Sequence, residues 1–156
     1  MQWSDVLADP TLRDLPFKIE LNQWGLIEMS PASTWHGRRQ TRVIQYLTRK
    51  LVSGEIITEP AVQTAIGVRV PDVGWGSAQF IKTQGNTTPL SIAPELCVEV
   101  LSDSNSDAEM SAKRAAYFAA GAQEVWLVKD DESIVVYTAA GLQSSSMIVS
   151  EVPKLA

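Results

Sequence analysis

The sequence predicts an α/β fold in which helices pack on a mixed β-sheet. Segments with the periodicity of strands and of helices alternate along the chain. The run Leu96 to Leu101 is almost continuously apolar, as is typical of strands covered on both faces. The chain has 156 residues, 45% of them hydrophobic, with no internal repeat. These properties predict one domain spanning residues 1–156.

Local periodicity and turn chemistry predict the individual elements. A hairpin is expected near the N-terminal end, because two short strands flank a polar turn that ends in Gly25. Ser106 begins a capping box before an alanine-rich helix, and Gly121 is placed to end that helix. The elements expected in chain order are strands over 17–21 and 26–29, a helix over 34–52, neighbouring strands over 55–59 and 62–70, a loop over 77–94, a strand over 96–101, a helix over 106–120 and a strand pair over 124–129 and 133–138.

The helix expected over 34–52 sorts its side chains by face. Its apolar residues recur at helical spacing, and His36 and Gln40 fall on the same inward stripe. The opposite face carries the positive charges, which are Arg38, Arg42 and Arg49, with Arg39 and Lys50 on the flank. This basic face is either an ordinary solvated helix face or a surface that contacts the phosphates of a nucleic acid.

Charge and hydropathy limit the classes of partner. The net charge of −5 argues against general affinity for nucleic acid, which comes largely from Lys and Arg. A local basic surface, or a metal ion in an acidic site, would have to supply the positive potential. No window approaches the roughly 18 apolar residues of a membrane span, and the N-terminus does not read as a signal peptide. We therefore expect a cytoplasmic protein without a membrane partner, in which Cys97 is a buried, inert thiol.

Glu99 is the most informative residue, because it interrupts the apolar run from Leu96 to Leu101. Burying an unpartnered carboxylate costs several kcal/mol. An Arg or Lys partner, or a water-facing position at a strand edge, would resolve this cost. A divalent metal ion would also resolve it, since carboxylates and backbone carbonyls are its usual ligands.

Two further residues gain significance only together with Glu99. Asp72 follows Pro71 at the end of an expected strand, where a Pro-Asp turn is common by itself. Lys113 shares a helical stripe with Met110 and Tyr117, so it leans towards an apolar face, although a lysine can also extend from such a face to water. The combination predicts an acidic metal site with a nearby ammonium group.

These residues, in this order, resemble a known family. Pro71-Asp72, Glu99 to Ser102, Lys113 with Tyr117, and Glu124 to Val128 are similar to the motifs of the Uma-type putative restriction endonuclease family of the PD-(D/E)XK nuclease superfamily. The similarity also includes Glu20-Leu21, Met29-Ser30-Pro31, His36-Gly37 and Val135 to Tyr137, and so covers roughly residues 17–138. Leu101 departs from the superfamily pattern, because a lysine normally stands there. The family places its lysine on the following helix, which matches Lys113.

The resemblance implies a restriction-endonuclease-like three-layer α/β/α core with an added N-terminal β-hairpin. It also implies an endonuclease that hydrolyses phosphodiester bonds in nucleic acid with Mg²⁺ or Mn²⁺. DNA is the expected substrate, although the sequence itself does not distinguish DNA from RNA. Asp72, Glu99 and the Val100 carbonyl would bind the metal, and Lys113 would orient or help to deprotonate the attacking water. Glu20 is a further candidate as an additional carboxylate near the metal; the alternative, from its alternation with apolar residues in its strand, is that it faces solvent. Other candidates are His36 as a hydrogen-bonding or structural histidine, and Ser102 and Gln40 for positioning.

Two other functions stay open. The loss of the motif lysine at Leu101 and the acidic net charge would also fit an inactive nuclease-fold module that binds nucleic acid or protein. A metal-dependent hydrolase acting on a smaller substrate is the second. A homodimer is a further expectation from the superfamily, with Trp3, Trp24 or Trp75 covering its interface if exposed.

Overall fold

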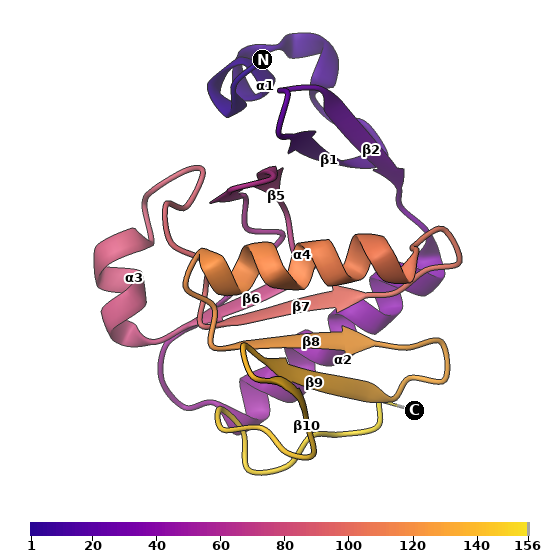
Figure 1. Cartoon of the computed structure of the whole chain (residues 1–156), viewed down its shortest axis with the longest axis vertical. Coiled ribbons are helices and arrows are strands. Elements are labelled where there is room, and N and C mark those ends of the chain that lie inside the picture. The colour runs from indigo at the N-terminus through magenta and orange to yellow at the C-terminus, as the bar shows by residue number, and fades with distance from the viewer. Residues whose placement is uncertain (156) are drawn as a thin grey trace.

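The structure is a computed structural model that describes residues 1–155, and it contains two β-sheets. The core sheet has six strands in the order β10-β9-β8-β7-β6-β3, and the N-terminal sheet has four in the order β2-β1-β5-β4 (Figure 1). The strands are β1 Phe17–Asn22, β2 Ile27–Pro31, β3 Glu55–Thr58, β4 Val62–Thr64, β5 Gly67–Arg69, β6 Val73–Gly76, β7 Leu96–Val100, β8 Glu124–Val128, β9 Ile134–Thr138 and β10 Gly141–Gln143. The helices are α1 Trp3–Ala8, the 3₁₀-helix η1 Pro10–Leu12, α2 Thr34–Lys50, α3 Ala78–Gln84 and α4 Asp107–Ala119.

The core sheet is mixed and lies between two helical layers, which is the restriction-endonuclease-like α/β/α arrangement. Strands β7 and β8 are parallel, and the other neighbouring pairs are antiparallel. Helix α4 crosses one face of the sheet and α2 lies behind the other (Figure 1). Because side chains alternate along a strand, Val98 of β7 packs with Val43 of α2, whereas Cys97 packs with Tyr117 of α4. Glu99 therefore points to the α4 side of the sheet.

The N-terminal sheet stands at one end of the core sheet (Figure 1). The expected hairpin is present as β1 and β2, in which Ile19 pairs with Met29, and β1 also pairs with β5. Val6 of α1 packs with Leu21 and Val68 in a small apolar core separate from that of the core sheet. This second sheet positions one face of β1 above the carboxyl end of β7.

Helix α4 forms as its capping residues predict. The Ser106 hydroxyl accepts a hydrogen bond from the Glu109 amide at the first turn, and Gly121 follows the helix with a φ of 110°. Met110 and Tyr117 are buried on the face that meets the sheet. Lys113 lies between them on this face and is only 5% exposed.

The structure differs from the expected elements in the middle of the chain. The segment 62–70 is a hairpin of β4 and β5, because Gly67 adopts a left-handed φ of 105° at the turn. β3 does not neighbour it but pairs with β6, in the other sheet. Strand β6 was not expected, since glycines occupy two of its four positions; an added Cβ at Gly74 would lie 2.9 Å from both Pro60 and Pro94.

The segment 77–94, expected to be a loop, contains helix α3. The Ser77 hydroxyl caps this helix by accepting a hydrogen bond from the Phe80 amide over 3.2 Å. Phe80 is its one buried residue, so no apolar periodicity marks the helix in the sequence. At the C-terminal end, β10 extends the expected strand pair by one short strand.

Two surface features concern possible partners. None of the helices in residues 1–155 is long and apolar enough to cross a membrane. Of the three tryptophans considered for an interface, Trp24 is 74% exposed, while Trp3 and Trp75 are half-buried.

Candidate active site

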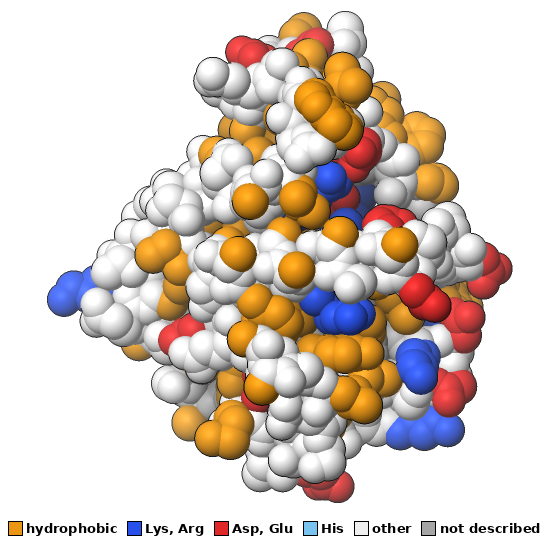
Figure 2. All heavy atoms as spheres, in the orientation of Figure 1, with side chains coloured by type: hydrophobic (Ala, Val, Ile, Leu, Met, Phe, Trp, Pro, Cys, Tyr) orange, Lys and Arg blue, Asp and Glu red, His pale blue; other side chains and the backbone are white. Residues whose placement is uncertain are grey.

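A cavity of about 850 Å³ opens where the N-terminal sheet, the first turn of α2 and the carboxyl end of β7 meet. Its lining includes Lys18 of β1, His36 of α2, Glu99 of β7 and Lys113 of α4. On the surface, acidic and basic side chains meet in the hollow between the N-terminal sheet and α4 (Figure 2). Charged side chains from four separate elements are thus brought to one place.

Asp72 lies directly before β6 and is fully buried. Its Oδ2 accepts a hydrogen bond from the Val100 amide over 2.7 Å and lies 3.2 Å from Nε2 of His36. Burial alone would raise the pKa of the Asp72 carboxyl, but the His36 hydrogen bond and the Lys18 charge outweigh it and lower the pKa to about 2. Asp72 is therefore ionised at neutral pH.

Glu99 points from β7 towards α4, where two side chains contact the same oxygen. Oε1 accepts a hydrogen bond from the Tyr117 hydroxyl over 2.6 Å and lies 3.4 Å from Nζ of Lys113. Burial raises the pKa of the Glu99 carboxyl, and the charges of Lys18 and Lys113 only partly offset this effect. The salt-bridge explanation for a carboxylate in this apolar run is thus present in the structure.

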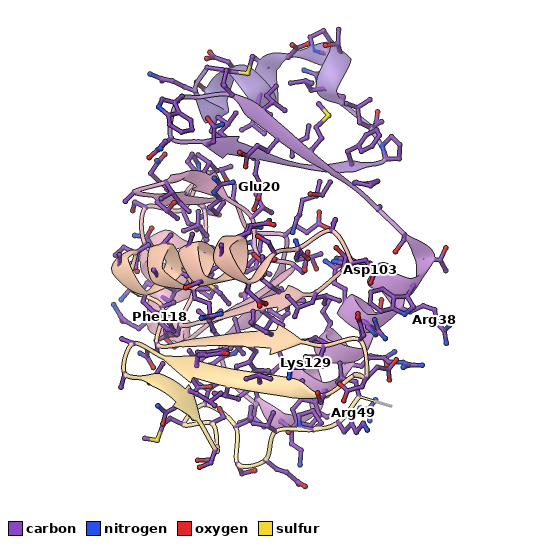
Figure 3. All side chains as sticks on the ribbon, turned by 45° about the vertical axis from the view of Figure 1, so that its right-hand side comes forward. Glu20, Arg38, Arg49, Asp103, Phe118 and Lys129 are labelled. Carbon is purple, nitrogen blue, oxygen red and sulfur yellow. The ribbon has the colours of Figure 1, made fainter. Side chains whose placement is uncertain are left out.

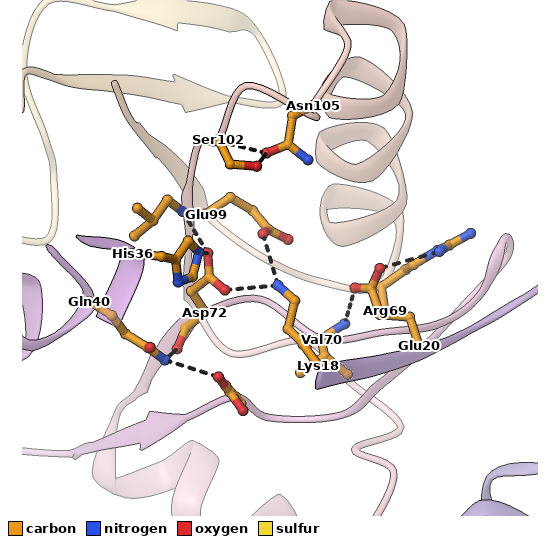
Figure 4. A network of polar contacts seen from close by, with 12 residues as sticks. Lys18, Glu20, His36, Gln40, Arg69, Val70, Asp72, Glu99, Ser102 and Asn105 are labelled. Carbon is orange, nitrogen blue, oxygen red and sulfur yellow. Dashed lines mark hydrogen bonds and ion pairs between the residues drawn. The ribbon is translucent and has the colours of Figure 1, made fainter. Parts of the chain in front are cut away.

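Lys18 is a member of the site that sequence reasoning missed. Its Nζ lies 2.8 Å from Oδ1 of Asp72 and 3.6 Å from Oε2 of Glu99, so one ammonium bridges the two carboxylates (Figure 4). Burial opposes the charge, but Glu99 and Asp72 outweigh burial and raise the pKa of Lys18. A signal was available, since Lys18 stands two residues before Glu20 and residues at this spacing share a strand face.

Glu20 points from β1 towards the core sheet (Figure 3) and is 6% exposed. It accepts a hydrogen bond from the Val70 amide over 2.7 Å and contacts Nζ of Lys113 at 3.0 Å. Arg69 also contacts Glu20, at 3.4 Å, and pairs with Glu28. The alternative in which Glu20 faces solvent is therefore wrong.

Lys113 lies between two carboxylates rather than extending to water. Burial opposes its charge, but Glu99 and Glu20 outweigh burial and raise the pKa of the Lys113 ammonium. Lys113 therefore keeps its proton at neutral pH. The group can donate hydrogen bonds, but it is a poor proton acceptor.

Helix α2 contributes two of the candidates through its inward stripe. The hydrogen bond to Asp72 raises the pKa of the His36 imidazole, because it favours the protonated ring. Gln40, one turn further along, donates a hydrogen bond from Nε2 to the Asp72 carbonyl over 2.7 Å (Figure 4). Both residues hold the segment that carries Asp72.

The loop that follows β7 is held by Ser102. Its amide donates a hydrogen bond to Oδ1 of Asn105 over 2.9 Å, which closes a turn before α4 (Figure 4). Leu101, at the position of the superfamily's lysine, packs partly buried against the core beneath α4. Lys113 and Lys18 supply the two ammonium groups near Glu99 from other elements.

Comparison with protein families gives a match over residues 9–152 to the family Uma2, described as "Putative restriction endonuclease". The chain belongs to this family. Membership supports a nuclease function and hence a nucleic-acid substrate. A comparison with curated proteins found no match.

A solved structure agrees with the Uma2 fold. The chain is similar to a crystal structure described as a putative nuclease of the DUF820 family from Anabaena variabilis, with a TM-score of 0.72 and 18% sequence identity. The match covers 100% of this chain and 91% of that one. At this identity the likeness shows the fold.

Restriction-endonuclease-like nucleases generally use divalent metal ions, and the carboxylates of the Uma2 site bear on whether such an ion fits here. No three His, Cys, Asp or Glu side chains within residues 1–155 are grouped to hold one ion. Two carboxylates nevertheless converge, since Lys18 lies within 4 Å of both Asp72 and Glu99. Each has one oxygen fixed by protein donors and the other turned to the ammonium. The pair fits an oxygen-ligand site for Mg²⁺ or Mn²⁺ that water and substrate complete.

The basic residues of α2 differ from one another in the structure. Arg38 and Arg49 are exposed, and Arg38 points away from the molecule (Figure 3). Arg42 pairs with Glu132. Arg39, expected on the flank of the basic face, is instead 5% exposed, with its guanidinium 3.2 Å from the ring centroid of Trp35.

Proposed function

We propose that the protein is a metal-dependent endonuclease that hydrolyses phosphodiester bonds in nucleic acid, with DNA as the first substrate to test. One observation carries the proposal. Asp72 and Glu99 each present one oxygen to a common cation position beside a cavity of about 850 Å³, with Lys113 3.4 Å from Glu99. A divalent ion there would supply Lewis-acid activation of water and neutralise charge on the scissile phosphate.

The side chains of the site would then position the metal ion, the attacking water and the scissile phosphate. Asp72, Glu99 and the Val100 carbonyl are the proposed metal ligands, and His36 and Tyr117 fix the two carboxylates by hydrogen bonds. The proposed role of Lys113 is donation to the attacking water or a phosphate oxygen, because its raised pKa keeps it protonated. Glu20 holds Lys113 in this place from the opposite side.

Arg38 and Arg49 are the proposed contacts to the phosphate backbone outside the cavity. Both are exposed on α2, whereas the pairing of Arg42 with Glu132 leaves it less available. Such contacts would offset the net charge of −5 locally. They would position the nucleic acid without reading its sequence.

Cleavage of single-stranded, duplex and branched DNA in Mg²⁺ or Mn²⁺ tests the proposal. Wild type and the exposed control Glu55→Gln should cleave, and EDTA should stop both. Asp72→Ala and Glu99→Ala should lose activity by a factor of about 100 or more. Equal cleavage by all four proteins would identify a contaminant, and no cleavage by wild type on any substrate would overturn the proposal.

A second candidate is a nuclease-fold module that binds nucleic acid without cleaving it. The position of the Lys18 ammonium between the two carboxylates favours it, because a fixed cation there would exclude a metal. Binding of DNA by wild type with a steep salt dependence, but without cleavage in either metal, would support this candidate.

A further inference from the structure

In both Asp72 and Glu99, the two carboxylate oxygens have different partners. Oδ2 of Asp72 is held by the Val100 amide and His36, and Oε1 of Glu99 is held by Tyr117 and Lys113. The other oxygen of each, Oδ1 and Oε2, contacts Lys18. The scaffold thus fixes one half of each carboxylate, and a movable side chain contacts the other half.

We propose that Lys18 is a built-in cation of this site, which a divalent metal ion must displace in order to bind Asp72 and Glu99. The inference rests on the proposed metal site and adds a residue, Lys18, that lowers the affinity of this site for the metal ion. The ammonium and the ion need the same two oxygens, so they cannot occupy the site together. Repulsion between a divalent ion and an ammonium at contact distance adds to this exclusion.

The surroundings of Lys18 provide both a reason for its position and space for its movement. Two buried carboxylates without a cation would be costly, so the ammonium compensates them when no metal is bound. The Lys18 side chain is 14% exposed and lines the cavity, so its flexible stem can carry the charge into solvent. Lys113 lacks this freedom, because Glu20 and Glu99 contact it on two sides and only 6% of its side chain is exposed.

Lys18 also lies in a different sheet from the one to which Asp72 and Glu99 belong. It stands on β1 of the N-terminal sheet, whereas Asp72 and Glu99 belong to the core sheet or its adjoining loop. In the metal-free protein the bridge therefore joins the two sheets at the cavity. Metal binding would break this bridge, whereas the contact between Glu20 of β1 and Lys113 of α4 would remain.

Isothermal titration of the purified full chain with Mn²⁺, without nucleic acid, tests the inference directly. Lys18→Met should bind Mn²⁺ at least about tenfold more tightly than wild type, because the competing charge is gone. The matched control Lys82→Met, which removes an exposed lysine from α3, should bind like wild type. Asp72→Asn should abolish binding in the presence or absence of Lys18.

Thermal unfolding gives an independent measurement. In EDTA, Lys18→Met should unfold at a lower temperature than wild type, since Asp72 and Glu99 lose the ammonium that bridges them. Mn²⁺ should raise its unfolding temperature by more than that of wild type, because ligand stabilisation follows affinity. Should Lys18→Met fail to fold without metal, Lys18→Gln keeps an amide donor for Asp72 and should also bind Mn²⁺ more tightly than wild type.

Equal or weaker Mn²⁺ binding by both Lys18 variants would overturn the inference, and so would the absence of binding in wild type and variants alike. Loss of the proposed function gives a different pattern. Tighter Mn²⁺ binding by Lys18→Met, combined with no cleavage of DNA by wild type, would refute the nuclease activity and retain the role of Lys18.

Discussion

The hydroxyl of Tyr117 donates a hydrogen bond to Oε1 of Glu99 over 2.6 Å, and neither residue is more than 3% exposed. The bond joins the middle of the sheet to the last turns of α4. It leaves Oε2 of Glu99 turned towards Lys18. The orientation of a proposed metal ligand thus depends on a tyrosine that only the fold brings near it.

Tyr117→Phe tests this dependence. Removing a donor from a buried carboxylate should lower the free energy of unfolding by about 1–3 kcal/mol and weaken Mn²⁺ binding by allowing Glu99 to rotate. Urea unfolding and titration calorimetry measure the two effects. Tyr137→Phe, at a half-buried position of β9, is the matched control. A variant with wild-type stability and metal affinity would show that the hydrogen bond has no such role.

Arg39 should matter for stability and Arg38 should not. The Arg39 guanidinium is buried over Trp35 and lies 3.6 Å from Glu132, so Arg39→Ala should cost about 2 kcal/mol through lost packing and pairing. Arg38→Ala, on the neighbouring exposed position, should change stability by less than about 0.5 kcal/mol. Urea unfolding of both variants measures the contrast, and equal effects would contradict it.

Arg38 and Arg49 should matter for nucleic-acid binding in a salt-dependent way. Each phosphate contact that is lost should reduce the slope of log K against log salt by about 1 and weaken binding to all sequences alike. Arg42→Ala should have a smaller effect because Glu132 already pairs with Arg42. Titration of labelled DNA at several salt concentrations checks this. Unchanged slopes in Arg38→Ala and Arg49→Ala would leave the basic face as an ordinary solvated surface.

Glu28 should make the stability of the hairpin depend on pH. Burial alone would raise the pKa of Glu28, but the hydrogen bond and charge of Arg69 outweigh it and lower the pKa below the ordinary value of 4.5. Its contribution is therefore present above the unfolded pKa and is lost as pH falls through the folded pKa. Because the side chain is 47% exposed, the contribution should be below about 1 kcal/mol.

Urea unfolding at neutral pH and at about pH 3 measures this contribution. Glu28→Gln should lose part of the acid dependence shown by wild type, and the exposed control Glu55→Gln should retain it. A Glu28→Gln profile parallel to that of wild type would contradict the predicted linkage.

Local patterns in the sequence determined the helices and strands whose signals lie within the element itself. The hairpin, α2, β7, α4 and the pair β8 and β9 follow from periodicity, caps and glycines, because these signals act within a few residues. They also indicated Glu99, since a carboxylate in an apolar strand conflicts with its surroundings whatever the fold. Family motifs then pointed to Asp72 and Lys113.

Only the tertiary structure decided what those residues contact. β6 is hidden in the sequence by two glycines, which fit closely against Pro60 and Pro94 (Gly74) and against Phe80 (Gly76). Arg39 is buried because Trp35 and Glu132 surround it. Lys18 joins the carboxylates because the second sheet places β1 over the end of β7. Contacts between residues 54 or 81 positions apart depend on packing between whole elements, and no local pattern encodes them.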